Sequence, residues 1–396
     1  MPFDEHQLAR LLELYPSSNP EALLHATAAL GFSVDEYFRT NPDLKEAGLD
    51  EAGAAYHYLS CGALHEQRRF NSCVQEGDRS WIAALQVFPL DSPASRMLLV
   101  NLMLNRIWSD RLPLDAGHGT CREFLEVCRR KAIRPVLMIG DSHCQAYLVP
   151  QEIGTIVHIP LQMVCHGGSA AGLANPDSKS GFGGAIARFF DTHADLIREF
   201  ELPCFFKFGQ VDAEFVWIFK RAQRRETRWS AAGFEAFARN AVARYMDFLE
   251  RLSAAHGLVG QVRVLSIFPP TLSDASWHKG YVNARIRRLE SDMEEDVLSE
   301  RVRDLSIPTQ RERTRLHALW NALVMAECAR RGLLYVDDFQ ALLDHRGLVD
   351  DAYTAGHDGA DHHLAVAVMG GVVRNIFKRY ATTADAPGDD GPGGEC

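Results

Sequence analysis

Short apolar runs alternate with longer amphipathic stretches from about residue 134 onward. The runs with the length and composition of buried strands are residues 136–139, 155–159, 204–208, 262–267 and 333–336. Stretches with helical spacing are residues 182–200, 231–255, 312–331 and 363–380. Because alternating strands and helices form parallel sheets covered on both faces, we predict a three-layer α/β/α fold around a five-stranded, flavodoxin-like parallel sheet.

The first 110 residues have a different pattern, with leucines at near-helical spacing and no convincing strand. We therefore predict an all-helical N-terminal region over residues 1–110, and a linker with a lead-in helix over 111–133. The α/β domain is expected over 134–380, with an insertion at 269–308 after the fourth strand. Residues 381–396 are rich in Gly, Pro and Asp and are predicted to be disordered.

Composition narrows the functional classes. The chain is 46% apolar and carries a formal net charge of -10, which argues against a nucleic-acid partner. Its nine cysteines include no CxxC pair, a pattern typical of reduced thiols rather than of disulfides or a zinc site. We find neither a secretory signal nor an apolar run long enough to span a membrane, and therefore expect a cytoplasmic protein.

The main chemical signal is the segment Arg134-Pro-Val-Leu-Met-Ile-Gly-Asp-Ser-His143, in which an apolar strand runs into a small polar turn. Ligands and chemistry gather at the carboxyl ends of parallel strands, so Ser142 is placed where a nucleophile would act. A serine hydroxyl needs a base to take its proton. The segment Asp358-Gly-Ala-Asp-His-His-Leu364 supplies candidate bases and carboxylates near the other end of the chain.

The Gly140-Asp-Ser-His143 turn after a strand resembles the first block of the SGNH (GDSL-like) hydrolase superfamily. Three further segments follow in family order, so the resemblance covers about residues 134–380. It implies that Ser142 is the nucleophile and that its N–H contributes to the oxyanion hole. Next comes a Gly-rich loop after the second strand, in which Gly168, or else Ala170, is expected to donate a second N–H.

The last two blocks depart from the family pattern. Where many members carry Gly-x-Asn-Asp, this chain has Gly209-Gln-Val-Asp212, so Gln210 becomes the candidate oxyanion donor and Asp212 is expected to brace the loop. The family places an Asp three residues before its catalytic His, but position 360 is Ala. We predict His363 as the base, with Asp361 ahead of Asp358 as the carboxylate that orients it.

Several alternatives stay open. His362 is a rival base, and Cys144 is a rival nucleophile. His357, Asp358, Asp361, His362 and His363 resemble a metal-binding cluster, but the spacing HExxH is missing and we expect no metal or other cofactor. The substrate-binding candidates are the following residues: Asp141, His143, Asp212, Arg221, Arg224 and Arg225. The three arginines belong to a basic run that is either a solvated helix face or a phosphate site.

Residues 32–71 resemble a short helical module of bacterial polysaccharide-biosynthesis proteins, on the segments Asn41-Pro-Asp-Leu44, Tyr56-His-Tyr-Leu59 and Arg68-Arg-Phe-Asn71. The sequence therefore predicts a serine-dependent acyl-ester hydrolase or O-acyltransferase that acts on a bacterial glycan or glycoconjugate, with acyl-CoA as a possible acyl donor. The alternative is an inactive SGNH-fold scaffold of surface-polysaccharide assembly, which Val211 and Ala360 would favour.

Overall fold

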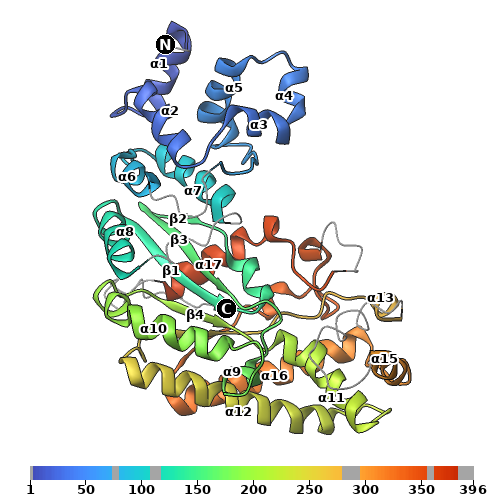
Figure 1. Ribbon diagram of the computed structural model, residues 1–396. Coiled ribbons are helices and arrows are strands. Elements are labelled where there is room, and N and C mark those ends of the chain that lie inside the picture. The colour runs from blue at the N-terminus through green and yellow to red at the C-terminus, as the bar shows by residue number, and fades with distance from the viewer. Residues whose placement is uncertain (1–2, 74–79, 108–116, 279–294, 355–360, 382–396) are drawn as a thin grey trace, which may run out of the picture.

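The structure, a computed structural model, describes residues 3–73, 80–107, 117–278, 295–354 and 361–381. A six-stranded sheet lies at its centre, in the order β2-β3-β1-β4-β5-β6 (Figure 1). The strands are β1 (Ile133–Gly140), β2 (Gln151–Ile153), β3 (Ile156–Val164), β4 (Cys204–Lys207), β5 (Val262–Leu265) and β6 (Leu334–Val336). All neighbours pair in parallel except β2, which is antiparallel to β3. The predicted α/β class is therefore confirmed.

Each of the five predicted runs lies in or overlaps one of the parallel strands, whereas β2 was not predicted. This strand has only three residues, and so short and polar a run does not stand out as a strand in the sequence. The prediction for β3 began correctly but ended five residues early, because Pro160 and Gln162 interrupt the apolar run. The pairing with β1 continues through both positions, so tertiary contacts extend the strand beyond its local signal.

The register aligns the carboxyl ends of three neighbouring strands. Gly140 at the end of β1 pairs with Val164 of β3 on one side and with Lys207 of β4 on the other. The bonds continue past the strands: Cys165 N donates to Gly140 O at 2.7 Å, and Asp141 N donates to Lys207 O at 3.0 Å. The segments that follow β1, β3 and β4 therefore lie side by side at one edge of the sheet.

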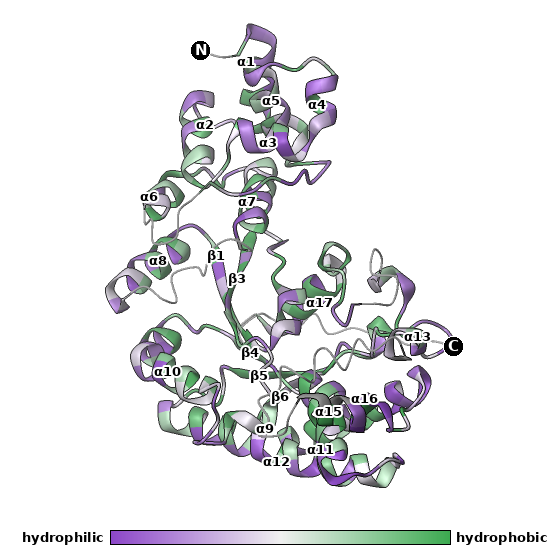
Figure 2. Cartoon of the chain, turned by 45° about the vertical axis from the view of Figure 1, so that its right-hand side comes forward, coloured by the Kyte–Doolittle hydropathy of each residue, from purple (hydrophilic) through white to green (hydrophobic). Residues whose placement is uncertain are grey.

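Long helices cover both faces of the sheet (Figures 1 and 2). Among the described residues, the helices of the α/β region are α8 (His118–Arg130), α9 (Ala170–Leu173), α10 (Phe182–Glu199), α11 (Trp217–Arg224), α12 (Ala231–His256), α13 (Asp274–His278), α15 (Glu295–Arg303), α16 (Gln310–Arg331) and α17 (Gly370–Tyr380). Successive residues of a strand point to opposite faces. On β4, Phe205 faces Phe377 of α17, whereas Phe206 faces Phe190 of α10. Helices α10 and α17 therefore lie on opposite sides of the sheet.

The last predicted helix begins later than expected. We predicted a helix from residue 363, but α17 begins at Gly370, after a short 3-10 turn over Val366–Val368. The carboxylate of Asp361 accepts a hydrogen bond from the backbone N–H of His363 at 3.0 Å. This side-chain turn competes with helix formation, so His363 lies on a loop ahead of the helix.

The N-terminal region is helical, as predicted, and forms the upper part of the molecule in Figure 1. Its helices are α1 (Glu5–Leu14), α2 (Pro20–Ala29), α3 (Val34–Thr40), α4 (Pro42–Glu46), α5 (Glu51–His57), α6 (Ser80–Val87) and α7 (Pro93–Ile107). A buried aromatic cluster of Phe32, Tyr37, Tyr58 and Phe70 holds the predicted module together. None of the described helices has the length and apolar character needed to cross a membrane.

Gly140, the residue before the turn of Asp141 and Ser142, is required by close packing. A Cβ at this position would lie 2.7 Å from Cys144 Cβ and would also press on the backbone oxygen of Lys207. We expect Gly140→Ala to lower the free energy of unfolding by about 1–3 kcal/mol, the usual cost of overpacking. The matched control is Gly119→Ala, because a Cβ at residue 119 of α8 meets nothing within 4 Å. Urea unfolding of both variants tests this, and an equal stability of Gly140→Ala and wild type would contradict it.

Candidate active site

Ser142 lies directly beyond the carboxyl end of β1. Asp141 caps the 3-10 turn Ser142–Tyr147, and its side chain accepts a hydrogen bond from the N–H of His143 at 2.9 Å. Ser142 is partly exposed, whereas Asp141, His143 and Cys144 are buried. The turn therefore presents the serine hydroxyl to solvent at the edge of the sheet.

The loop ahead of α17 brings a histidine and a carboxylate to this serine. His363 Nε2 lies 3.0 Å from Ser142 Oγ, and His363 Nδ1 lies 2.8 Å from Asp361 Oδ1. The two contacts join residues 221 positions apart into one hydrogen-bonded chain. Both distances fall within hydrogen-bond reach, as is required between a nucleophile and its base and between the base and the group that orients it.

Asp361 is held in its ionised form. The hydrogen bond from His363 lowers the pKa of the Asp361 carboxyl well below its usual range. An ionised carboxylate can only accept hydrogen bonds, so Nδ1 of His363 carries a proton, and in the neutral imidazole Nε2 offers its lone pair to Ser142. This is the tautomer that a general base requires.

The alternatives to Ser142 and His363, which are Cys144 and His362, lie in buried surroundings that suit these roles less well. Cys144 is fully buried, and burial raises the pKa of its thiol well above the ordinary value, which disfavours the reactive thiolate. His362 is buried as well, with its ring packed edge-on against Phe215 and His143. Asp358, the second candidate carboxylate, and His357 lie outside the described residues.

Most of the predicted oxyanion donors are engaged elsewhere. The N–H of Gly168 donates to Cys165 O at 2.8 Å, and the N–H of Ala170 donates to Asp212 Oδ2 at 2.5 Å. The Gln210 amide donates to Glu214 Oε1 at 2.7 Å, and its oxygen accepts from Phe268 N. The N–H of Ser142 makes no hydrogen bond to any residue that the structure describes.

A buried polar layer beneath Ser142 was not anticipated from the sequence. Burial favours the neutral form of Asp141, but His143 and Lys207 outweigh it and hold the pKa of Asp141 below its ordinary value. Lys207 is fully buried at the end of β4, with Nζ 4.2 Å from the centre of the Phe268 ring. A lysine inside the apolar run 204–208 was the available signal, since buried lysines need a partner.

Asp212, for which we predicted a bracing role, is bonded to the loop after β3. Its carboxylate accepts hydrogen bonds from the N–H groups of Ala170 and Ala171, at the start of α9. Burial raises the pKa of Asp212 to about 7, and burial likewise raises the pKa of nearby Glu214 to about 7. Asp212 faces the backbone rather than an open pocket, which supports its bracing role over direct substrate contact.

The raised pKa of Glu214 predicts a pH-dependent stability. The folded protein keeps the proton up to about pH 7, whereas the unfolded chain releases it near its ordinary value of 4.5. Stability therefore falls as pH rises between these values, by about 3 kcal/mol for Glu214. We expect Glu214→Gln to lack this part of the decline in stability. The free energy of unfolding of the variant should therefore rise relative to that of wild type between pH 5 and pH 8. Urea unfolding at both pH values measures it, and an unchanged difference would contradict the assignment.

The three predicted phosphate-binding arginines do not form one exposed face. Arg221 is only 2% exposed, and its guanidinium donates to the backbone oxygens of Thr227 and Ser306 at 3.1 and 3.0 Å. It therefore ties the segment after α11 to the segment after α15. Arg224 and Arg225 are exposed, and Arg224 Nη1 lies 3.8 Å from Glu226 Oε1.

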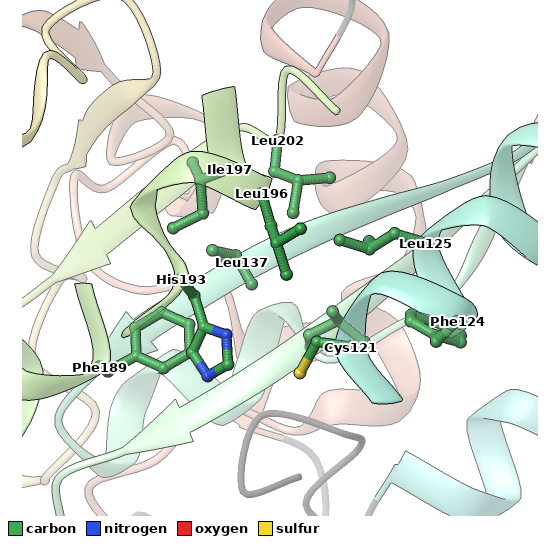
Figure 3. Close-up of a pocket in the computed structure, with 10 residues that line it drawn as sticks. Cys121, Phe124, Leu125, Leu137, Phe189, His193, Leu196, Ile197 and Leu202 are labelled. Atoms are coloured by element: carbon green, nitrogen blue, oxygen red, sulfur yellow. The ribbon is translucent and has the colours of Figure 1, made fainter. Parts of the chain in front are cut away.

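An apolar cavity of about 20 Å³ lies away from the serine, between α8, α10 and the sheet (Figure 3). Its lining is apolar apart from His193, so it is a packing gap and not a reaction site. A second small cavity lies between Glu214, Trp217, Trp277, Arg313 and His317.

Fold and site together define an α/β protein with a serine, a histidine and an aspartate in hydrogen-bonded order at the carboxyl edge of its sheet. Comparison with known proteins adds no further assignment: no protein family, no curated protein and no solved structure matches the chain.

Proposed function

We propose that the protein is a serine-dependent acyl-ester hydrolase or O-acyltransferase of the SGNH type that acts on a bacterial glycan or glycoconjugate. The observation that carries this proposal is the chain of contacts from Asp361 through His363 to Ser142. A binding scaffold has no need of this chain, so the geometry favours the enzyme over the inactive alternative.

The order of the strands supports the same class. Numbered along the chain, the five parallel strands β1, β3, β4, β5 and β6 lie in the spatial order 2-1-3-4-5, which is the flavodoxin-like order. Ser142 follows the first of these strands, and Asp361 and His363 follow the last. This placement agrees with the resemblance to SGNH hydrolases in the first block, which contains Ser142, and in the last, which contains His363.

The reaction follows from the positions of the three side chains. Ser142 Oγ attacks the ester carbonyl while His363 Nε2 takes its proton, and Asp361 stabilises the resulting imidazolium. His363 then gives this proton to the leaving alkoxide, and the acyl group remains on Ser142. Water, or a sugar hydroxyl, attacks the acyl-enzyme with His363 again as base, which releases the free acid or transfers the acyl group.

The oxyanion that forms at the carbonyl needs donors at the same edge. The N–H of Ser142 is suited to this role because it has no partner among the described residues. A second donor is expected from the turn at residues 165–169, which the bond from Cys165 N to Gly140 O holds beside the serine. Gly168 can serve only if substrate displaces its bond to Cys165 O.

A glycan substrate is inferred from the N-terminal module, which resembles those of polysaccharide-biosynthesis proteins. Arg224 and Arg225 remain candidates for contact with phosphate on a lipid-linked glycan, a nucleotide sugar or acyl-CoA. The test is an assay of purified protein with O-acetylated mono- and oligosaccharides, with and without an added acceptor sugar. Free acetate indicates a hydrolase and an acetylated acceptor indicates a transferase. Glycan binding without either product would favour the inactive scaffold.

A further inference from the structure

Three histidines meet beside the catalytic serine. The ring of His143 packs against those of His362 and His363, with centroids 5.0 and 4.8 Å away, and the latter two rings are 3.8 Å apart. One ring nitrogen from each of the three lies within 4.8 Å of the others. Neutral imidazole is the commonest metal ligand in proteins, and three imidazoles suffice for a zinc site with an open position.

A carboxylate holds the His143 ring in the tautomer that can bind a metal ion. Its Nδ1 lies 3.0 Å from Asp141 Oδ1, and the same oxygen accepts the His143 backbone N–H. A carboxylate accepts, so Nδ1 carries the proton and Nε2 presents a lone pair. This Nε2 is buried and has no hydrogen-bond partner among the described residues. A carboxylate behind a histidine, with the other nitrogen directed at the ion, is the usual support of a metal ligand.

The required movement is small. With Zn–N bonds of about 2.0–2.1 Å, the nitrogens around a tetrahedral ion are about 3.4 Å apart. The present spread of up to 4.8 Å therefore has to close by about 1.4 Å. Rotation about the Cβ–Cγ bonds of the histidines supplies part of this movement, because that torsion has broad minima. The hydrogen bonds of His143 Nδ1 and His363 Nδ1 to Asp141 and Asp361 limit it.

A second group, His57, Cys61 and Glu66 in the N-terminal module, is a weaker candidate. Arg68 is paired with both Glu66 and Asp43, and His57 Nδ1 is bonded to Tyr37 Oη at 3.0 Å. These contacts already engage the carboxylate of Glu66 and one ring nitrogen of His57, which an ion would need as ligands. The second group still has to be controlled for in any metal titration.

We propose that His143, His362 and His363 form a binding site for a divalent transition-metal ion of the zinc type. His363 belongs both to this site and to the catalytic pair with Ser142. When the ion is bound, the lone pair of His363 is used for coordination and no longer takes the proton of Ser142. The ion therefore acts as a reversible inhibitor of the serine. The inhibition rests on the proposed function, whereas the binding of the ion does not.

Binding is tested first, by calorimetric titration of metal-free protein with Zn²⁺ and by the visible absorption of Co²⁺ in its place. Both use the Cys61→Ser variant, which removes the thiol ligand of the second group. His143→Asn keeps a side-chain N–H near the position of Nδ1 and removes Nε2. We expect one ion per chain and at least a 100-fold loss of affinity in His143→Asn. Asp141→Asn, which changes only the supporting carboxylate, should lose about 10–100-fold.

The matched control is His118→Asn, which removes an exposed histidine bonded to Asp195 and should leave the affinity unchanged. Equal Zn²⁺ affinity in His143→Asn and His118→Asn overturns the proposal. So does the absence, in the Cys61→Ser protein, of any intense Co²⁺ band of the kind that tetrahedral nitrogen ligation gives. This second readout needs no histidine substitution and remains informative if His143→Asn fails to fold.

Inhibition is tested by covalent labelling of Ser142 with a fluorophosphonate, with Zn²⁺ and again after EDTA. We expect Zn²⁺ to suppress labelling at least tenfold and EDTA to restore it. Labelling that proceeds equally in saturating Zn²⁺ overturns the inhibitory role. If Zn²⁺ binds at the histidines but Ser142 is never labelled, the metal site stands and the proposed hydrolase fails. If Ser142 is labelled but no ion binds, the hydrolase stands and the metal site fails.

Discussion

We expect the replacement of Ser142 by Ala to abolish ester turnover and to leave the fold intact. Removing one member of a nucleophile–base pair lowers kcat by about 10⁴-fold or more. The lost hydroxyl is partly exposed at a strand end, and its described partner is His363 Nε2, so little packing is lost. Hydrolysis of p-nitrophenyl acetate and of O-acetylated sugars measures the rate, and urea unfolding measures the stability.

The control for this experiment is Cys144→Ala. This variant removes the rival nucleophile from a fully buried position and is expected to retain activity within a few-fold. Equal rates for wild type and Ser142→Ala, or loss of activity in Cys144→Ala alone, would show that another group attacks the ester.

Asp361→Asn is expected to have the second-largest effect. The amide can donate to Nδ1 of His363, which favours the tautomer with the proton on Nε2 and leaves Ser142 without a base. Loss of the orienting carboxylate in a serine–histidine–aspartate set costs about 10⁴-fold in kcat, and KM should change little because Asp361 contacts the histidine and not the ester. Steady-state kinetics separates the two parameters.

Asp358→Asn is the matched variant, because Asp358 is the other carboxylate ahead of His363 in the sequence. Its activity should stay close to that of wild type. If Asp358→Asn loses activity and Asp361→Asn retains it, the histidine is oriented by Asp358, and the contact at 2.8 Å between Asp361 and His363 is not the functional one.

Local patterns were sufficient to predict the α/β class, because buried strands and amphipathic helices have distinct spacing. Residues 204–207 and 262–265 form strands as expected, since apolar runs of this kind fit a sheet covered on both faces. β2 was missed because its three residues carry no such run. The start of α17 was misplaced because the Asp361 turn, a side-chain effect, ends the local helical preference.

The predicted serine, histidine and aspartate meet in the structure, and order along the chain was enough to suggest them. What surrounds them depends on three-dimensional contacts that spacing does not contain. Arg221 belongs to a basic run in the sequence yet points inward to two backbone oxygens. Lys207 and His143 form the polar layer under the serine only because β1 and β4 end in register.

The most direct test of the central claim is mass spectrometry of the protein after reaction with a fluorophosphonate, followed by peptide mapping. The hydrogen-bonded chain from Asp361 to Ser142 predicts one adduct per molecule, located on Ser142, and none in Ser142→Ala or after prior denaturation. An unmodified Ser142 in folded wild-type protein, or an adduct located on another residue, would contradict the assignment of Ser142 as an activated nucleophile.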